Sequence, residues 1–151
     1  MKTFVWVMSA VLFLAAAGTA SASDPTGIYA RIDKVVLEPS AEAPERVQVW
    51  GTFALAEGRG GDTYSKPVRG YLYYSLVKGK EDMCRKEWAD LGKVAGKDQC
   101  VSFGSRYRPL GTVHKADTKP KNPDPFPLAT GVVKVNASHP QAKALSAAAV
   151  Q

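Results

Sequence analysis

The segment from Glu81 to Phe103 constrains the fold more than any other, because it holds the strongest helix pattern and both cysteines of the chain. Spacings of four, three and four residues place several side chains on one stripe of a helix. These side chains are Cys84, Trp88, Leu91 and Ala95. Gly96 predicts the end of the helix. We therefore expect one helix with an inward-facing Cys84, followed directly by Cys100 at the start of a strand.

The segments before this helix alternate apolar and polar residues, which is typical of β-strands. Arg46–Ala56 shows the clearest alternation. One face of this strand is expected to carry Val47, Val49, Phe53 and Leu55, and the other Gln48, Trp50, Thr52 and Ala54. Val68–Val77 divides in the same way, with Leu72 and Tyr74 on one side and Tyr71, Tyr73 and Ser75 on the other.

Tyr29–Leu37 predicts the first strand, but its alternation slips at Asp33 and Lys34. A β-bulge there brings the apolar residues on its two sides onto one face. These residues are Ile32, Val35 and Leu37.

After the helix, Val101 and Phe103 indicate a fourth strand and Gly111–Lys115 a fifth. Four prolines between Ala116 and Thr130 argue against regular structure there, and Gly131–Val135 is typical of a late edge strand. The alanine-rich stretch Gln141–Gln151 indicates either a frayed helix or a disordered end.

The order of these elements is strand, strand, strand, helix, strand, strand (β-β-β-α-β-β), which predicts a mainly β fold: a small five-stranded OB-like barrel. A β-sandwich with a helical insertion is the alternative. We expect one domain over residues 23–135 and a flexible Ala-rich tail over 136–151. The segments RVQVWGTFAL and CRKEWADL resemble those of small exported bacterial proteins of uncharacterised function with an OB-like pattern. The resemblance covers roughly residues 28–135 and implies no activity.

The first 22 residues have the pattern of a secretory signal peptide. Lys2 is followed by an uncharged run of 14 residues, Phe4–Ala17, and then by small residues up to Ala22. A membrane span needs about 20 apolar residues, so an uncleaved anchor is the less favoured reading. We expect cleavage after Ala22, no membrane span in the remaining chain, and a periplasmic or extracellular (secreted) location.

Two cysteines in an exported chain favour a disulfide bond, here between Cys84 and Cys100. A redox-active or metal-binding pair is the alternative. Redox motifs usually separate their cysteines by two residues, whereas 15 intervene here. The histidines, His114 and His139, lack the spacing of zinc ligands. The sequence therefore predicts a structural disulfide, no metal site and no cofactor.

If the second and third strands pair antiparallel, Trp50, Tyr71 and Tyr73 lie together on the face away from the core. Aromatic rings beside amide and hydroxyl groups suit stacking against sugars or bases, so these three are candidate ligand contacts. The alternative is that the proline-rich segment covers this face, with Phe126 docked on the rings.

Positive charge is concentrated after Cys100. Residues 101–151 contain 7 Lys and Arg against 2 Asp and Glu, while residues 23–100 contain 12 of each. No run of adjacent Lys or Arg concentrates this charge, so an ordinary solvated basic surface is the favoured interpretation, and a surface for acidic partners is the alternative. Export and the acidic loop that contains Glu38, Glu42 and Glu45 argue against nucleic acid. The sequence does not identify the partner; protein and polysaccharide are the classes left open.

Motifs of common enzymes are missing from the sequence: it contains no Gly-x-Ser-x-Gly elbow, no His-Glu-x-x-His helix and no phosphate-binding loop. We assign no catalytic residue. The expected function is a non-enzymatic exported binding or adaptor domain of unknown ligand that uses its aromatic face. The alternative is an exported hydrolase or redox protein whose site is not visible in the sequence, centred on His114.

Overall fold

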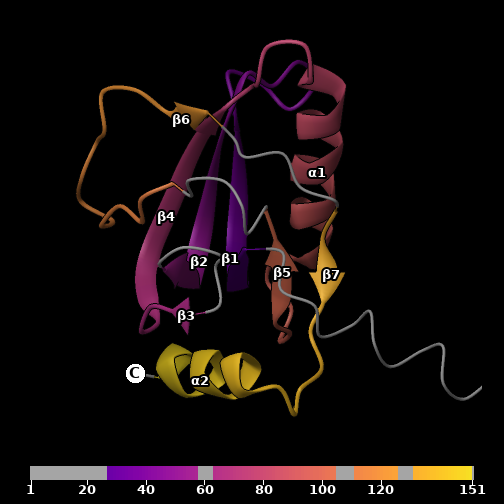
Figure 1. Cartoon of the computed structure of the whole chain (residues 1–151). Coiled ribbons are helices and arrows are strands. Elements are labelled where there is room, and N and C mark those ends of the chain that lie inside the picture. Colours follow the sequence, from indigo (N-terminus) through magenta and orange to yellow (C-terminus); the bar gives the residue numbers. More distant parts are fainter. Residues whose placement is uncertain (1–26, 58–62, 105–110, 126–130, 151) are drawn as a thin grey trace, which may run out of the picture.

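Long antiparallel strands form the centre of the protein, whose computed structural model describes residues 27–57, 63–104, 111–125 and 131–150. The strands are β1 (Ile28–Glu38), β2 (Arg46–Glu57), β3 (Thr63–Tyr64), β4 (Val68–Ser75), β5 (Val101–Phe103), β6 (Asp124–Pro125) and β7 (Val133–Lys134). The helices are α1 (Glu81–Val94) and α2 (Pro140–Ala149). The strands form one seven-stranded sheet in the order β6-β4-β2-β1-β5-β7, with β3 paired to β2 (Figure 1).

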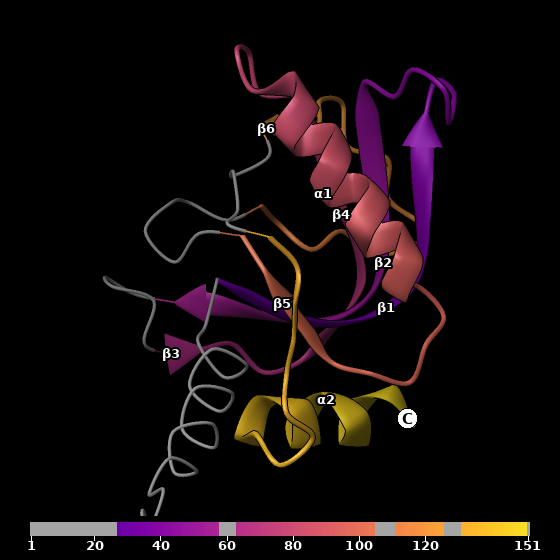
Figure 2. The same cartoon turned by 90° about the vertical axis from the view of Figure 1, so that its right-hand side faces the viewer.

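One helix packs on each face of the sheet. Figure 2 shows the strands lying between α1 on one side and α2 on the other. Two clusters of buried side chains correspond to these two layers. The sheet therefore separates two cores, and alternate residues of one strand enter different cores.

The larger core lies between the sheet and α1, and it confirms the predicted strand faces. Val47, Val49 and Phe53 of β2 pack there with Leu72 and Tyr74 of β4. The predicted helix stripe is confirmed as well, since α1 buries Cys84, Trp88 and Leu91 in this core. Gly96 ends the helix in a left-handed conformation (φ +76°) that favours glycine, and its N–H donates to the Ile32 carbonyl at 2.9 Å.

The predicted bulge in β1 is confirmed. The register with β2 shifts between Ile32, which pairs with Gly51, and Lys34, which pairs with Trp50. Because one extra residue is inserted, the apolar side chains on both sides of the bulge face α1: Ile32 is buried in the larger core, and Val35 and Leu37 pack against it.

The smaller core lies between the other face of the sheet and α2. Tyr29 of β1 and Ala54 of β2 meet Ala142 and Leu145 of α2 there. The side chain of His139 caps the helix by accepting the Gln141 N–H at 3.1 Å. Residues 140–149 are thus a packed helix, and the expectation of a flexible tail does not hold for them.

Among the described residues the strands form one open sheet, rather than the expected closed barrel of five strands or the alternative two-sheet sandwich. The predicted connectivity is present in part: β1, β2 and β4 pair in succession, α1 follows, and β5 returns to pair with β1. Closure requires a strand that joins the β4 edge to the β5 edge. In the described part of the chain these edges pair with β6 and β7, of two residues each, and with a single bridge at His114, which together offer too few backbone groups.

The predicted fifth strand, Gly111–Lys115, is reduced to a single bridge between His114 and Tyr71. A turn ends the extended stretch, because Thr118 donates both its N–H and its hydroxyl to the Lys115 carbonyl, at 3.0 and 2.7 Å. The late edge strand is confirmed in shorter form as β7, which pairs with β5.

The predicted disulfide between Cys84 and Cys100 is absent, and both cysteines are buried thiols. Cys84 belongs to the α1 core, whereas Cys100 belongs to the α2 core on the opposite face of the sheet. Cys100 directly precedes Val101, which faces α1, so alternation turns Cys100 toward α2. The two sulfur atoms are separated by the sheet, which also removes the basis for a redox or metal-binding pair.

The expected signal peptide, residues 1–22, lies outside the described residues, so export stays a prediction. Within the part of the chain that the structure describes, neither helix has the length and apolar character needed to span a membrane.

The burial of both cysteines predicts slow labelling of the native protein. Cys84 is fully buried and Cys100 is 5% exposed, and burial raises the pKa of both thiols, that of Cys100 to about 11. Alkylation of protein denatured without reductant, followed by intact mass measurement, should give two adducts. A denatured protein that takes up no label until reductant is added would contradict this arrangement.

Docking of α2 predicts a large stability loss when its anchor is truncated. Leu145 is fully buried, so Leu145→Ala should lower the free energy of unfolding by about 2–5 kcal/mol in urea titrations. Lys143→Ala, at an exposed position of the same helix, is the matched control and should change it by less than about 0.5 kcal/mol. Equal values for the two variants would mean that α2 does not pack on the sheet.

Candidate functional site

Part of the sheet face that carries α2 is left uncovered by that helix. The strand registers define a row of side chains across it: Lys34 of β1 lies opposite Trp50 of β2, which lies opposite Tyr71 of β4. The neighbouring row contains Gln48 opposite Tyr73. The three predicted site residues therefore do share one face, as expected from the alternation of the strands.

The indole of Trp50 is contacted from both sides. Tyr71 stacks on it with ring centroids 4.5 Å apart and an interplanar angle of 24°. The ammonium nitrogen of Lys34 lies 4.7 Å from the centroid of the Trp50 ring. Since β1 and β4 flank β2 on opposite sides, Lys34 and Tyr71 approach the indole from opposite directions. Lys34 is exposed and held by a cation–π contact worth about 0.5–1 kcal/mol, so a ligand can displace it readily.

Tyr71 is buried rather than open to a ligand, with 4% of its surface exposed. Its hydroxyl donates to the Thr118 carbonyl, and its backbone N–H and C=O pair with His114 at 3.0 and 2.8 Å. Its ring also lies 5.4 Å from the imidazole of His114. A methyl group at Gly70 would come within 2.1 Å of the His114 carbonyl, so glycine is required for this close approach. Within the described residues, Tyr71 is covered by the chain from His114 to Thr118, and Thr118 belongs to the segment that was expected to cover this face. Phe126 lies outside the described residues.

Tyr73 is half-buried and belongs to a polar network around Glu38. Glu38 accepts from the Tyr73 hydroxyl at 3.3 Å, from Arg46 at 3.3 Å and from the Gln48 amide at 2.8 Å. Gln48 in turn accepts the indole N–H of Trp50 at 3.0 Å. Burial raises the pKa of Tyr73, and the negative charge of Glu38 raises it further by a smaller amount. This network fixes the orientation of the Trp50 indole.

A hollow of about 420 Å³ lies beside the Trp50 ring and is called here the Trp50 hollow. Its lining residues are Asp33, Lys34, Trp50, Arg69, Gly70 and Ala116. Arg69 and Asp33 form an exposed ion pair of 3.4 Å at its rim. Of the three predicted site residues only Trp50 lines the hollow, while Lys34, Asp33 and Arg69 were not anticipated. Their places depend on the strand register around the bulge, which alternation alone does not determine.

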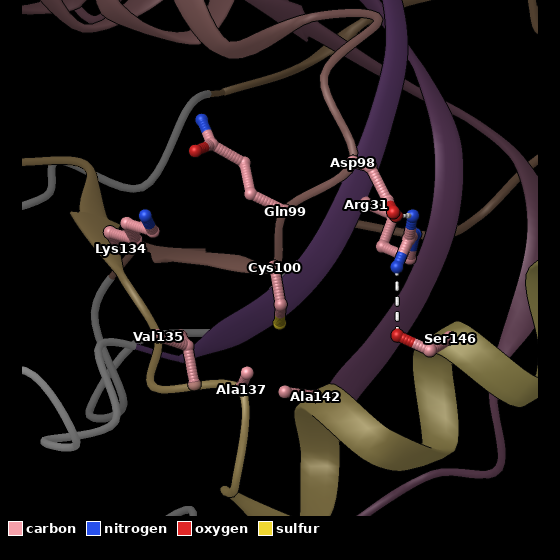
Figure 3. A pocket seen from close by; sticks show the side chains of 9 residues that line it. All are labelled: Arg31, Asp98, Gln99, Cys100, Lys134, Val135, Ala137, Ala142 and Ser146. Carbon is pink, nitrogen blue, oxygen red and sulfur yellow. Dashed lines mark hydrogen bonds and ion pairs between the residues drawn. The ribbon is translucent and has the colours of Figure 1, made fainter.

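A second hollow of about 310 Å³ lies where α2 meets β5 and β7 (Figure 3). The sulfur of Cys100 points into it toward Ala142 of α2, as the figure shows. At its rim Arg31 pairs with Asp98 and donates to the Ser146 hydroxyl at 2.7 Å. These contacts tie α2 to β1 and to the segment before β5, so we interpret the second hollow as a packing gap.

Residues 111–125 are held against β4 and supply one side of the Trp50 hollow through Ala116. Tyr71 anchors this segment at His114, and β6 pairs with β4 at Tyr74 and Ser75. Tyr74 is fully buried, and burial, followed by the negative charge of Asp124, raises its pKa far above the usual 10.0.

Metal ligands do not gather at either hollow: within the described ranges, no group of three or more His, Cys, Asp or Glu side chains is placed to hold a metal ion. In comparisons with known proteins, no family model, no curated protein and no solved structure matches the chain.

Alkaline pH should destabilise the fold through Tyr74. The folded state binds the Tyr74 proton more tightly than the unfolded chain, so this contribution is complete below pH 10 and is lost as the pH rises further. Urea midpoints measured from pH 8 upward should fall above about pH 10. The fall should be smaller in Tyr74→Phe, which has no proton to lose. An equal decline in both proteins would contradict the assignment to Tyr74.

Proposed function

We propose that the protein is an exported, non-enzymatic binding or adaptor domain that contacts its ligand at the Trp50 hollow. The supporting observation is the hollow itself, about 420 Å³ in volume, whose lining combines a half-buried indole with the cationic side chains of Lys34 and Arg69. Ligand sites commonly combine an aromatic surface with a few placed polar groups. The half-buried indole and the polar side chains around it match that description.

The chemistry of the hollow favours an acidic sugar chain as the ligand. A sugar ring can stack on the Trp50 indole once Lys34 swings aside, and the displaced ammonium can then pair with a carboxylate of the sugar. Arg69 offers a second cation, and the Asp33 carboxylate can accept a hydrogen bond from a sugar hydroxyl. The lining contains two cations against one carboxylate.

The connectivity of the sheet supports the same location. Three antiparallel strands, a helix and a strand that returns to the first strand resemble the OB fold, and we propose that the sheet is an open relative of it. In OB folds, oligosaccharides and oligonucleotides bind on the face of the second and third strands. Trp50 and Tyr71 belong to β2 and β4, the second and third long strands of this chain.

The rival class, an exported hydrolase or redox protein, gains no support from these contacts. The two cysteines lie in different cores, on opposite faces of the sheet. His114 packs on the ring of Tyr71, and its backbone is paired with the same residue. We therefore keep the binding function as the proposal.

Isothermal titration with an oligouronate and a neutral oligosaccharide of equal length tests the proposal. Trp50→Ala should weaken oligouronate binding by about tenfold or more, because the stacking surface is lost. Lys34→Ala should also weaken it, while the affinity for the neutral sugar should stay equal or rise as the indole is uncovered. Binding should decrease with added salt.

Lys86→Ala is the matched control, because it also removes an exposed lysine, but from α1 on the other face of the sheet. It should bind as the unmodified protein does. A Trp50→Ala variant that remains folded by circular dichroism and binds with full affinity would exclude the Trp50 hollow as the binding site. Absence of binding by the unmodified protein to either sugar would exclude the proposed ligand class.

A further inference from the structure

The outer edge of β1 is open along the second half of the strand. β2 pairs with β1 over its whole length, whereas β5 pairs with the other side only at Ile28–Ala30. The Gly96 N–H then occupies the Ile32 carbonyl. Beyond that point no described strand borders β1, and Figure 2 shows its upper half at the margin of the sheet.

Two hydrogen bonds, to the carbonyls of Glu38 and Ile32, show which peptide groups of β1 are directed toward β2 and which toward the open edge. The Glu38 carbonyl accepts from Glu45, next to β2, so Glu38 is directed toward β2. Successive residues of an antiparallel strand direct their peptide groups to opposite sides. Leu37 and Val35 therefore present their N–H and C=O groups outward. The outward Ile32 carbonyl agrees with this assignment, because the bulge after Ile32 shifts the alternation by one residue.

Bulges, prolines and charges usually protect the edge strands of monomeric proteins. Here the bulge lies before Lys34, and Pro39 lies directly after Glu38. The two therefore flank a window of five residues, 34–38, without interrupting it. The three central residues of the window, Val35, Val36 and Leu37, are apolar and half-buried. Such an edge is suited to accept another strand.

We propose that a second copy of this chain pairs with this edge, forming a two-fold dimer with a continuous sheet. In the antiparallel register centred on Val36, Val35 lies opposite Leu37 of the second copy, and their outward peptide groups form the hydrogen-bonded pairs. Lys34 then lies opposite Glu38 of the second copy, and the symmetry repeats this pair. Opposite charges facing each other across two strands stabilise their pairing.

Other registers lose this match. A shift of one step centres the pairing on Val35 and places Lys34 opposite Val36 and Asp33 opposite Leu37. A shift the other way places Val35 opposite Pro39, which has no N–H to donate. The window is therefore self-complementary in one register, which favours a second copy over an unrelated strand as its partner.

Sedimentation equilibrium of the purified protein, from low micromolar to millimolar concentration, tests the dimer. Val35→Pro removes an outward N–H and leaves the β1–β2 hydrogen bonds intact, so the dimer should weaken by about tenfold or more while the fold is retained. Val35→Ala is the matched control: it removes the same side-chain contact with the core, keeps the N–H, and should remain dimeric. A monomer at every concentration, or a dimer unaffected by Val35→Pro, would overturn the proposal.

Crosslinking tests the register separately. In the proposed dimer the two Val36 Cα atoms are about 4.5 Å apart, within the range that a disulfide spans, so Val36→Cys should form a covalent dimer on oxidation. Lys34→Cys is the control, because its two copies lie about 13 Å apart and should not crosslink. Equal crosslinking of the two variants would overturn the register. Val35→Pro leaves Trp50 in place, so failure of the dimer is distinguishable from failure of the sugar site.

Discussion

The antiparallel pairing of β1 with β2 is the interaction on which the rest of the structure depends. It runs from Ile28 opposite Leu55 to Glu38 opposite Arg46, and both helices pack on side chains that alternate along these two strands. Phe53 enters the core beneath α1, while its neighbour Ala54 enters the core beneath α2. β4 and β5 add apolar residues to the core beneath α1, but they are held in place by pairing with β2 and β1, so loss of this ladder would remove both cores together.

The same alternation explains which structural predictions succeed. Strong apolar periodicity fixed the core faces of β2 and β4 and the stripe of α1, because burial requires one face to be apolar throughout. The slip at Asp33 correctly indicated the bulge. Alternation does not predict pairing between segments that are far apart in sequence. The edges of β4 and β5 are bordered by strands of two residues each, and no local pattern indicates that strands this short leave the sheet open.

The disulfide prediction was wrong because it was based on the expected export and on the presence of two cysteines, and did not consider which face of β5 the Cys100 side chain lies on. Val101 and Cys100 are adjacent, and an apolar residue that faces α1 requires its neighbour to face away. The sequence thus contained the signal that Cys84 and Cys100 lie on opposite sides. The docking of α2 was harder to predict, since an alanine-rich helix with Leu145 as its one large fully buried side chain has a weak amphipathic pattern.

The candidate site was predictable in its aromatic part only. Trp50 and Tyr71 do stack, but Tyr71 is covered by the chain around His114, and the charged side chains of the Trp50 hollow depend on the bulge. The central claim is that this hollow binds an acidic sugar chain. The most direct measurement is the indole N–H signal of Trp50 in proton–nitrogen correlation spectra during titration with an oligouronate. A saturable shift of the Trp50 signal, with the buried Trp88 signal unchanged, is the predicted result; an unchanged Trp50 signal, or equal shifts of both, would contradict it.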